Sequence, residues 1–92
     1  MRLKFLYKRH FVEILLLLNQ SPKSFNELLK TLNAYPDTLS RRLKEMQSLN
    51  LITQVEMDGK IKYNLTDKGK KLIPLIEDFL KLIKEIEKLI LE

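Results

Sequence analysis

The chain has 92 residues, which is enough for one domain with a modest hydrophobic core. Hydrophobic residues make up 45% of it and charged residues 32%, a balance typical of a globular chain and not of a disordered one. Cysteine is absent, which excludes disulfides, thiol chemistry and cysteine-ligated metal and fits a reducing cytoplasm, and the net charge of +5 favours an anionic partner.

Basic residues gather at the start of the chain, at Arg2, Lys4, Lys8 and Arg9. This segment and the apolar residues after it bear a slight likeness to a signal peptide, but Glu13 interrupts the apolar run and no small-residue cleavage site comes after it. The apolar run over residues 14–18 is far shorter than the ~20 residues that span a membrane. We therefore expect a cytoplasmic protein with no membrane partner.

The first predicted helix begins within residues 4–9 and ends near Asn19, because Ser21-Pro22 comes next and disfavours further helix. Residues 11–18 are strongly apolar, so we expect this helix to be the buried centre of the domain. His10 is the only histidine and has no cysteine to join it, so we expect a helix-surface or core-edge residue without chemistry.

A second helix is predicted from Ser24 onward. Ser24 and Glu27 have the spacing of a capping box, in which each side chain accepts a hydrogen bond from the other residue's backbone N–H. The next apolar residues share one helix face: Phe25, Leu28, Leu29 and Leu32. A turn at residues 33–35 then leads into a third helix.

The third predicted helix starts at Pro36, whose fixed φ suits a first helical turn. Leu39, Leu43 and Met46 recur at helical spacing and would bury one narrow stripe. The opposite side is polar and carries Asp37, Thr38, Arg41, Lys44, Glu45 and Ser48. Alone, this pattern fits a solvated amphipathic helix. After a short second helix it has helix-turn-helix order, and such a face can enter a DNA major groove.

Residues 51–65 predict a β-hairpin, which in this position would be a wing. A two-residue loop at Asp58-Gly59 would mix apolar and charged residues on both faces of the hairpin. A three-residue loop over residues 57–59 separates them, and we predict this register, which pairs Leu51 with Leu65, Thr53 with Tyr63 and Val55 with Ile61. Lys60 and Lys62 are candidate phosphate contacts, and a charged edge that discourages strand aggregation is their alternative role.

The last predicted helix has Thr66 as a suitable N-cap. Apolar residues then repeat with the 4-3 spacing of a coiled-coil seam, over Leu72, Ile76, Phe79, Ile83, Ile86 and Ile90. With their apolar neighbours they cover about 200° of the helix, roughly twice the width that packing on the helix's own domain requires. We therefore predict that this helix forms a homodimer, and we expect Pro74 to kink it near residues 70–74.

Together these elements predict a mainly α fold with a small β component. It is a winged helix-turn-helix with a two-stranded wing and a long C-terminal dimerisation helix. Residues 1–66 would form the DNA-binding domain and residues 67–92 the dimerisation helix, in one continuous domain. The sequence has no Gly-rich phosphate loop, nucleophile–base set or metal-ligand cluster, so we expect no enzymatic activity, cofactor or metal. The mixed charge on the polar face of the last helix argues against a membrane-surface role.

Five stretches of the sequence, residues 23–28, 39–46, 51–52, 61–69 and 72–74, resemble motifs of one known family, the HxlR family of winged-helix transcriptional regulators. Residues 23–28 (KSFNEL) are similar to the "RFxEL" motif of its second helix, and residues 39–46 (LSRRLKEM) with Leu51-Ile52 to its recognition helix and the exit from that helix. Residues 61–69 (IKYNLTDKG) resemble its "VEYxLTxKG" wing return, and Leu72-Ile73-Pro74 resembles the start of its last helix. The family's usual N-terminal cysteine and helix-one tryptophan are missing, which excludes thiol sensing, and the wing is several residues shorter. MarR-like and archaeal winged-helix regulators are the next most similar families.

The resemblance implies a homodimer on a roughly palindromic DNA duplex, with two copies of helix three in successive major grooves about 34 Å apart. On that basis Thr38, Ser40 and Arg41 would lie near base edges, with Arg41 as the candidate for guanine recognition. Phosphate contacts would come from Arg42, Lys44, Lys60, Lys62 and the N-terminal basic residues, Arg9 among them. An ion pair with Glu45 or Asp37 is the alternative role of Arg42. A winged helix used for protein assembly or RNA contact is the alternative function, because a fold does not determine a function.

Overall fold

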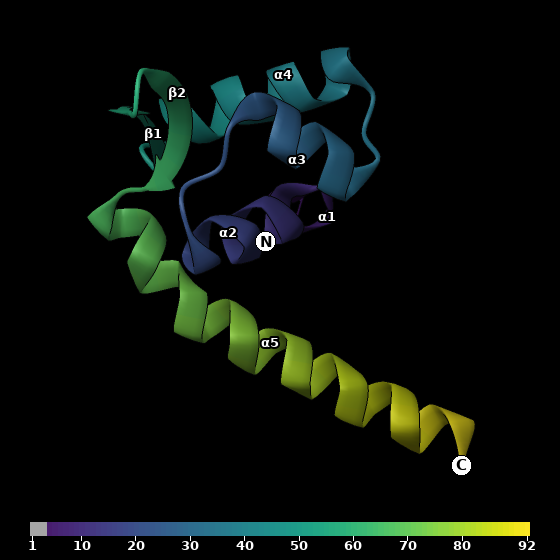
Figure 1. Cartoon of the computed structure of the whole chain (residues 1–92). Coiled ribbons are helices and arrows are strands. Elements are labelled where there is room, and N and C mark those ends of the chain that lie inside the picture. The colour runs from purple at the N-terminus through teal and green to yellow at the C-terminus, as the bar shows by residue number, and fades with distance from the viewer. Residues whose placement is uncertain (1–3) are drawn as a thin grey trace.

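The computed structural model describes residues 4–92, and Arg2 lies outside them. These residues form five helices and one hairpin (Figure 1), in the order α1 (Lys4–Tyr7), α2 (Phe11–Gln20), α3 (Phe25–Leu32), α4 (Pro36–Ser48), β1 (Ile52–Met57), β2 (Lys60–Leu65) and α5 (Asp67–Leu91). The predicted fold class is confirmed, because the short helices of the body precede a two-stranded wing and a long final helix.

Helix α2 is the centre of the core, as its apolar sequence predicts. Ile14 and Leu15 are completely buried, and α2 packs against α3, β2 and α5. The other elements contribute apolar faces to this core, and their buried residues are Leu28, Leu39, Leu43, Met46, Leu51, Ile52, Leu65, Ile73 and Ile76.

The N-terminal helix starts inside the predicted window, but it is broken into α1 and α2. The break lies at His10, whose backbone is left-handed with φ of 67° and whose residue surface is 8% exposed. Its ring Nδ1 lies 3.7 Å from the Glu13 carboxylate, and Phe5 of α1 packs against Phe11 of α2 across the break. The two helices are therefore in contact but point in different directions.

The helix-turn-helix begins and ends where the sequence predicts. The Ser24 hydroxyl accepts a hydrogen bond from Glu27 N at 3.1 Å, and the Glu27 carboxylate accepts one from Ser24 N at 3.0 Å. Asn33 ends α3 in the left-handed conformation with φ of 50°, and Pro36 occupies the first turn of α4. The capping box is confirmed.

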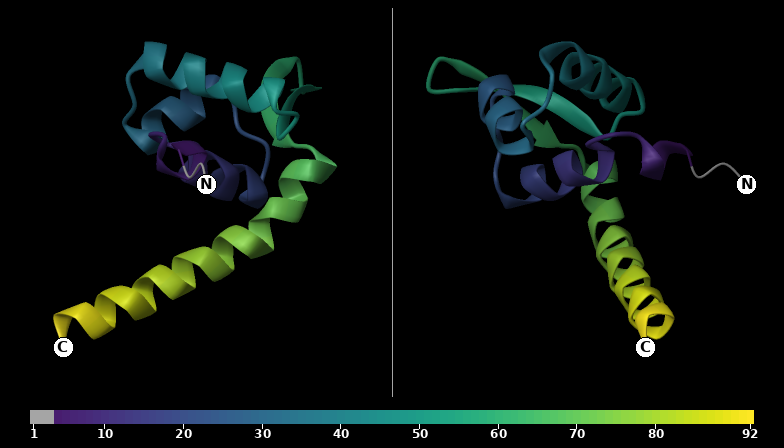
Figure 2. Two further views of the ribbon diagram at one scale, coloured as in Figure 1. Left: turned by 180° about the vertical axis from the view of Figure 1, so that it is seen from behind. Right: turned by 90° about the vertical axis from the view of Figure 1, so that its right-hand side faces the viewer.

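The predicted hairpin register is wrong. The loop has two residues, and β1 pairs with β2 so that Val55 lies opposite Lys62 and Glu56 opposite Ile61. Asp58 and Gly59 both have positive φ, 53° and 73°, which is the backbone of the tight turn that an Asp-Gly pair favours. The prediction assumed one buried face along the whole hairpin, whereas only the base is buried, at Ile52 and Leu65. Towards its tip the wing projects from the body, so mixed pairs cost little there (Figure 2).

The free edge of β2 is tied to the segment between α2 and α3. Lys23 and Tyr63 exchange two backbone hydrogen bonds, with N···O distances of 3.1 and 2.7 Å. One residue away, Lys62 Nζ lies 3.6 Å from the carboxylate of Glu27 on α3. These contacts hold the base of the wing against the helix-turn-helix.

The start of α5 is bound tightly to the α4–β1 connection. The Thr66 hydroxyl accepts a hydrogen bond from Gly69 N at 3.1 Å and donates one to the Asn50 carbonyl at 2.6 Å. Lys68 Nζ donates to the Leu49 carbonyl at 2.8 Å. Helix α5 then continues unbroken through Pro74, and its axis changes direction in its first turns (Figure 1). It leaves the body on the side opposite α4, which gives the molecule a long axis of 51 Å.

Candidate nucleic-acid interface

The outer face of α4 is the first part of the candidate interface. Leu39, Leu43 and Met46 are buried in the core, so the residues on the far side of the helix point to solvent. Arg41 and Lys44 are exposed there, and within residues 4–92 no ion pair holds either of them. Thr38 and Ser40 are half-buried on the two flanks. The face therefore presents two unengaged cations between two hydroxyl groups.

Arg42 takes part in internal contacts instead. Its side chain is 15% exposed, its Nε donates a hydrogen bond to the Arg9 carbonyl at 2.8 Å, and its Nη1 donates one to Glu45 at 3.2 Å. The structure thus shows the ion pair with Glu45 that the sequence allowed as the alternative role of Arg42.

Glu45 also receives a hydrogen bond from Lys8, in the turn after α1. Both side chains are part-buried, with 30% of Lys8 and 25% of Glu45 exposed. The hydrogen bond from Lys8 lowers the pKa of Glu45, and Arg42 adds to this, against the opposing effect of desolvation. The Lys8–Glu45 contact was not predicted, because the two residues lie 37 positions apart and their sequence carries no signal that joins them.

The wing and the N-terminal segment supply further cations. Lys60, beside the wing turn, is exposed, and so is Arg9. Lys62 is 26% exposed and is partly engaged by Glu27. The hydrogen bond from Ser24 N lowers the pKa of Glu27, and the nearby charge of Lys62 adds to the effect, so this carboxylate is ionised at neutral pH. Among the residues that the structure describes, Lys60 is therefore the wing lysine without an ion pair, and Lys62 helps to hold the wing.

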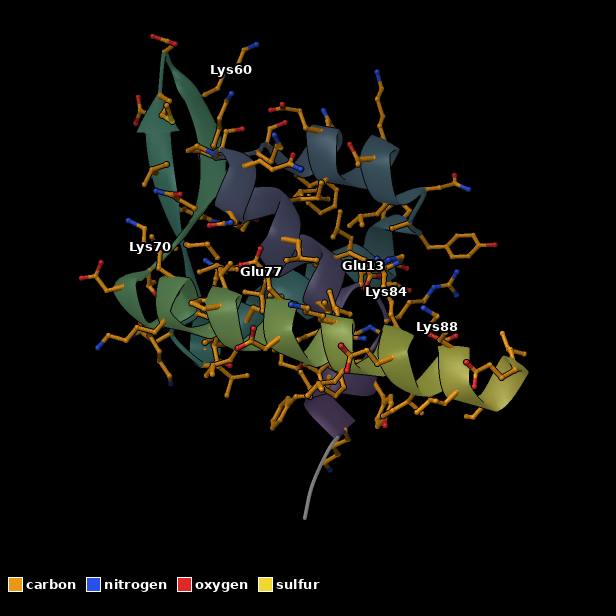
Figure 3. The ribbon with its side chains drawn as sticks, turned by 90° about the horizontal axis from the view of Figure 1, so that it is seen from below. Glu13, Lys60, Lys70, Glu77, Lys84 and Lys88 are labelled. Atoms are coloured by element: carbon orange, nitrogen blue, oxygen red, sulfur yellow. The ribbon has the colours of Figure 1, made fainter. Side chains whose placement is uncertain are left out.

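Helix α4 and the wing lie on one side of the molecule. Helix α4 runs along the top of the body in Figure 1 with the wing beside one end, whereas the C-terminal half of α5 lies on the opposite side (Figures 1 and 2). In Figure 3, which views the molecule from below, Lys60 at the wing lies well apart from Lys84 and Lys88 on α5. A duplex on the α4 face would leave the second half of α5 uncovered.

Helix α5 exposes an apolar stripe, but not the full seam that the sequence predicts. Of the predicted seam residues, Ile76 is 4% exposed and belongs to the core of its own chain, which corrects its assignment to dimerisation. Leu72, Phe79 and Ile83 are half-buried, and Ile86 and Ile90 are exposed. The outward stripe is rotated by about 60° from the predicted seam at 100° per residue, and it consists of Leu75, Phe79, Leu82, Ile86 and Leu89.

This α5 stripe has an apolar cavity beside its first residues. The cavity has a volume of about 200 Å³ and lies between α1 and α5, where Leu6 meets Leu72, Leu75, Ile76 and Phe79. At the far end of α5 the exposed fractions are larger, 70% for Leu89 and 73% for Ile90. Single exposed apolar residues are ordinary, but a continuous stripe of this length marks an interaction surface.

Among residues 4–92, no three acidic or histidine side chains gather as a metal site would require. None of the described helices is long and apolar enough to cross a membrane.

The fold and these surfaces define a winged helix-turn-helix protein with an exposed basic recognition helix. Over residues 5–89 the chain matches the family described as HxlR-like helix-turn-helix, and it belongs to that family. This is a family of DNA-binding transcription regulators, and the resemblance seen in the sequence motifs is thereby confirmed.

Individual relatives agree. An uncharacterized HTH-type transcriptional regulator of Methanocaldococcus jannaschii is 36% identical over 87 residues, which cover 86% of this chain and 81% of that protein. Another, from Halalkalibacterium halodurans, is 35% identical over 75 residues, covering 77% of this chain and 66% of that one. The reduced form of the transcriptional regulator YodB from B. subtilis superposes with a TM-score of 0.78 at 27% identity, covering 85% of this chain and 80% of YodB.

Proposed function

We propose that this protein is a sequence-specific, double-stranded DNA-binding transcription regulator that acts as a homodimer. In this proposal α4 enters the major groove and the wing lies on the flanking backbone. The observation that carries it is the outer face of α4, where Arg41 and Lys44 are exposed and unengaged in a chain of a DNA-binding family. An exposed helix that is anchored by one buried stripe is the element that major-groove recognition uses.

The role proposed for each residue follows from how exposed its side chain is and from whether another residue already binds it. Arg41 lies on the side of α4 away from the buried stripe, and its planar fork matches the O6 and N7 acceptors of guanine. Thr38 and Ser40 border it and would contact base edges or the nearest phosphates. Lys44, Arg9, Lys60 and Lys62 would contact phosphates, which position the protein without selecting sequence. Arg42, already bonded to Glu45 and to the Arg9 carbonyl, would act on phosphate with the part of its guanidinium that these bonds leave free.

The homodimer is proposed from the α5 stripe. Four of its residues are 56–70% exposed, so burying the stripe against a second copy would contribute roughly 4–8 kcal/mol before the costs of association. A second copy would also cover the cavity between α1 and α5, whose lining is apolar. Of the predicted seam, Ile86 and Ile90 remain available for this contact, and Leu72, Phe79 and Ile83 are partly available.

The dimer would set two α4 helices at a separation that matches one turn of the duplex, about 34 Å. The expected target is therefore a pseudo-palindromic operator. Selection of bound duplexes from a random pool tests this directly, because the recovered sequences should contain two inverted half-sites. Affinity should fall steeply with salt and should exceed the affinity for unselected duplex by roughly 10³-fold or more.

Recovery of no preferred sequence, with no duplex binding below about 100 mM salt, would contradict the proposal. In that case a winged helix for protein assembly or RNA contact becomes the better account of the same surfaces.

A further inference from the structure

The segment before α2 contacts both functional surfaces of the molecule. On one side, Leu6 of α1 lines the apolar cavity with Leu72, Leu75 and Phe79 of α5. On the other, the turn after α1 reaches α4 through the side chain of Lys8 and the carbonyl of Arg9. Residues 4–9 therefore lie between the α5 stripe and the recognition helix.

The carboxylate of Glu45 is the centre of the contacts between the turn and α4. Glu45 accepts a hydrogen bond from Lys8 and another from Arg42, and Arg42 in turn donates to the Arg9 carbonyl. These three bonds join two adjacent residues of the turn to two residues of α4 that are one helical turn apart. They fix the α1–α2 turn against one flank of the recognition helix.

Within the turn, Phe11 N donates a hydrogen bond to the Lys8 carbonyl at 3.1 Å, and one residue has an unfavourable backbone conformation. His10 holds a left-handed backbone conformation that a side chain with a Cβ disfavours, so contacts around it must maintain it. Lys8 also lies over the ring of Phe5, with Nζ 5.2 Å from the ring centre. Loss of the Glu45 contact would release Lys8, and with it one of the contacts that define the direction of α1.

We propose that Glu45 is a positioning residue for DNA recognition: through Lys8 and Arg42 it holds the α1–α2 turn against α4 and so fixes the recognition helix relative to the rest of the body. This inference rests on the proposed DNA binding of α4. Glu45 does not touch the duplex in this account, yet the sequence preference depends on it.

The negative charge of Glu45, taken alone, predicts the opposite effect on DNA affinity. A carboxylate on the DNA-facing helix repels phosphate, so its removal should tighten binding to every duplex alike. A positioning role instead predicts that specific affinity falls while non-specific affinity stays the same or rises. The ratio of the two affinities therefore separates the two roles.

The experiment compares the full-length wild-type protein with the variants Glu45→Gln and Lys8→Met. Each is titrated against a selected operator duplex and against a scrambled duplex of the same length and composition, at one salt concentration. Glu87→Gln is the matched control, because it removes the same charge from an exposed residue on α5. We expect the specificity ratio to fall roughly tenfold in both test variants and to stay unchanged in the control.

A specificity ratio that stays at the wild-type value in both test variants would overturn this inference and leave the proposed function standing. A wild-type protein without any specificity would overturn both. Thermal melts of all variants accompany the titrations. Should Glu45→Gln be unfolded at the assay temperature, Lys8→Met decides the outcome, because it leaves the Arg42–Glu45 pair in place.

Discussion

At the scale of single residues, Gly69 shows how closely α5 approaches the rest of the chain. A Cβ on this residue would lie 2.2 Å from the Leu51 carbonyl oxygen, which is backbone and cannot move aside easily. The same carbonyl accepts a hydrogen bond from Thr66 N at 3.0 Å. Any side chain at position 69 would therefore push the start of α5 away from the base of the wing.

We expect Gly69→Ala to destabilise the protein by about 1–3 kcal/mol or more, because overpacking against backbone forces the two segments apart. Urea unfolding measures this change. The control is Gly59→Asn at the wing turn, where nothing lies within 4 Å of an added Cβ and where asparagine tolerates the positive φ. Equal losses in the two variants would show that the close approach at Leu51 carries no special cost.

Glu45 makes the stability depend on pH. Its pKa is lowered in the folded protein, first by the hydrogen bond from Lys8, so its contribution to stability is present above its unfolded pKa, about 4.3. That contribution disappears as the pH falls from there through the lower pKa of the folded state. We expect the melting temperatures of wild type and Glu45→Gln to differ most near neutral pH and to converge as the pH falls below about 4. A constant difference across this range would contradict the ionised contact.

Arg41→Ala should weaken operator binding by about 1–3 kcal/mol, because a bidentate contact to guanine is lost. Its melting temperature should stay close to that of the wild type, since the side chain is exposed and unpaired within the described residues. Arg41→Lys is the matched control, because it keeps the charge and loses the planar fork. Lysine should therefore preserve non-specific binding and lose most of the sequence preference, as fluorescence anisotropy can measure.

At the scale of the elements, helical periodicity predicted α3 and α4, because each has one buried face, whereas the apolar run over residues 11–18 predicted α2. The break at His10 was not predicted, because no glycine or proline marks it in the sequence. The hairpin register was predicted wrongly because alternation has meaning only where one face is buried, and most of this wing is exposed. The turn residues Asp58 and Gly59, which favour a two-residue loop, indicated the correct register.

The prediction of the α5 stripe failed in part for a similar reason, because the sequence does not show which face of the helix is buried. Sequence predicted that the helix carries more apolar surface than its own domain can bury, and Leu75, Leu82 and Leu89 are indeed exposed. Which residues face outward depends on where the helix packs, and Ile73 and Ile76 take the inward positions. A spacing of 4-3 fits either stripe, so the sequence alone did not choose between them.

We expect the double variant Leu82→Glu and Ile86→Glu to be monomeric, because two buried carboxylates would have no partner in the dimer contact. Sedimentation velocity measures the change. Lys84→Glu on the same helix is the control, since position 84 lies outside the α5 stripe and its variant should remain dimeric. A double variant that still sediments as a dimer would place the contact elsewhere on the surface.

At the scale of the whole molecule, the order of elements and the motifs at residues 23–28 and 61–69 were sufficient to predict the fold and the family. The sequence predicted less completely which residues of the candidate nucleic-acid interface are exposed and which are held by other residues. Arg41 and Lys44 are exposed as expected, whereas the engagement of Arg42, Lys62 and Glu45 depends on contacts between distant segments. Sequence patterns within one helix carry no information about such contacts.

The proposed dimer would have a measurable effect on the salt dependence of DNA binding. The slope of log affinity against log salt counts the phosphates that a complex neutralises, so two bodies on one duplex should give about twice the slope of one. We expect the monomeric Leu82→Glu and Ile86→Glu variant to show roughly half the wild-type slope on the same operator. An unchanged slope would mean that a single body makes all of the phosphate contacts.

The first turns of α5 serve two purposes at once. Ile73 and Ile76 close the hydrophobic core, while Leu75, between them in sequence, is 65% exposed and begins the stripe. In the proposed dimer, folding of the subunit and association with a second one would therefore not be independent events, and each would favour the other. Dilution alone should lower the temperature at which the protein melts, so its resistance to heat should depend on how many copies are present.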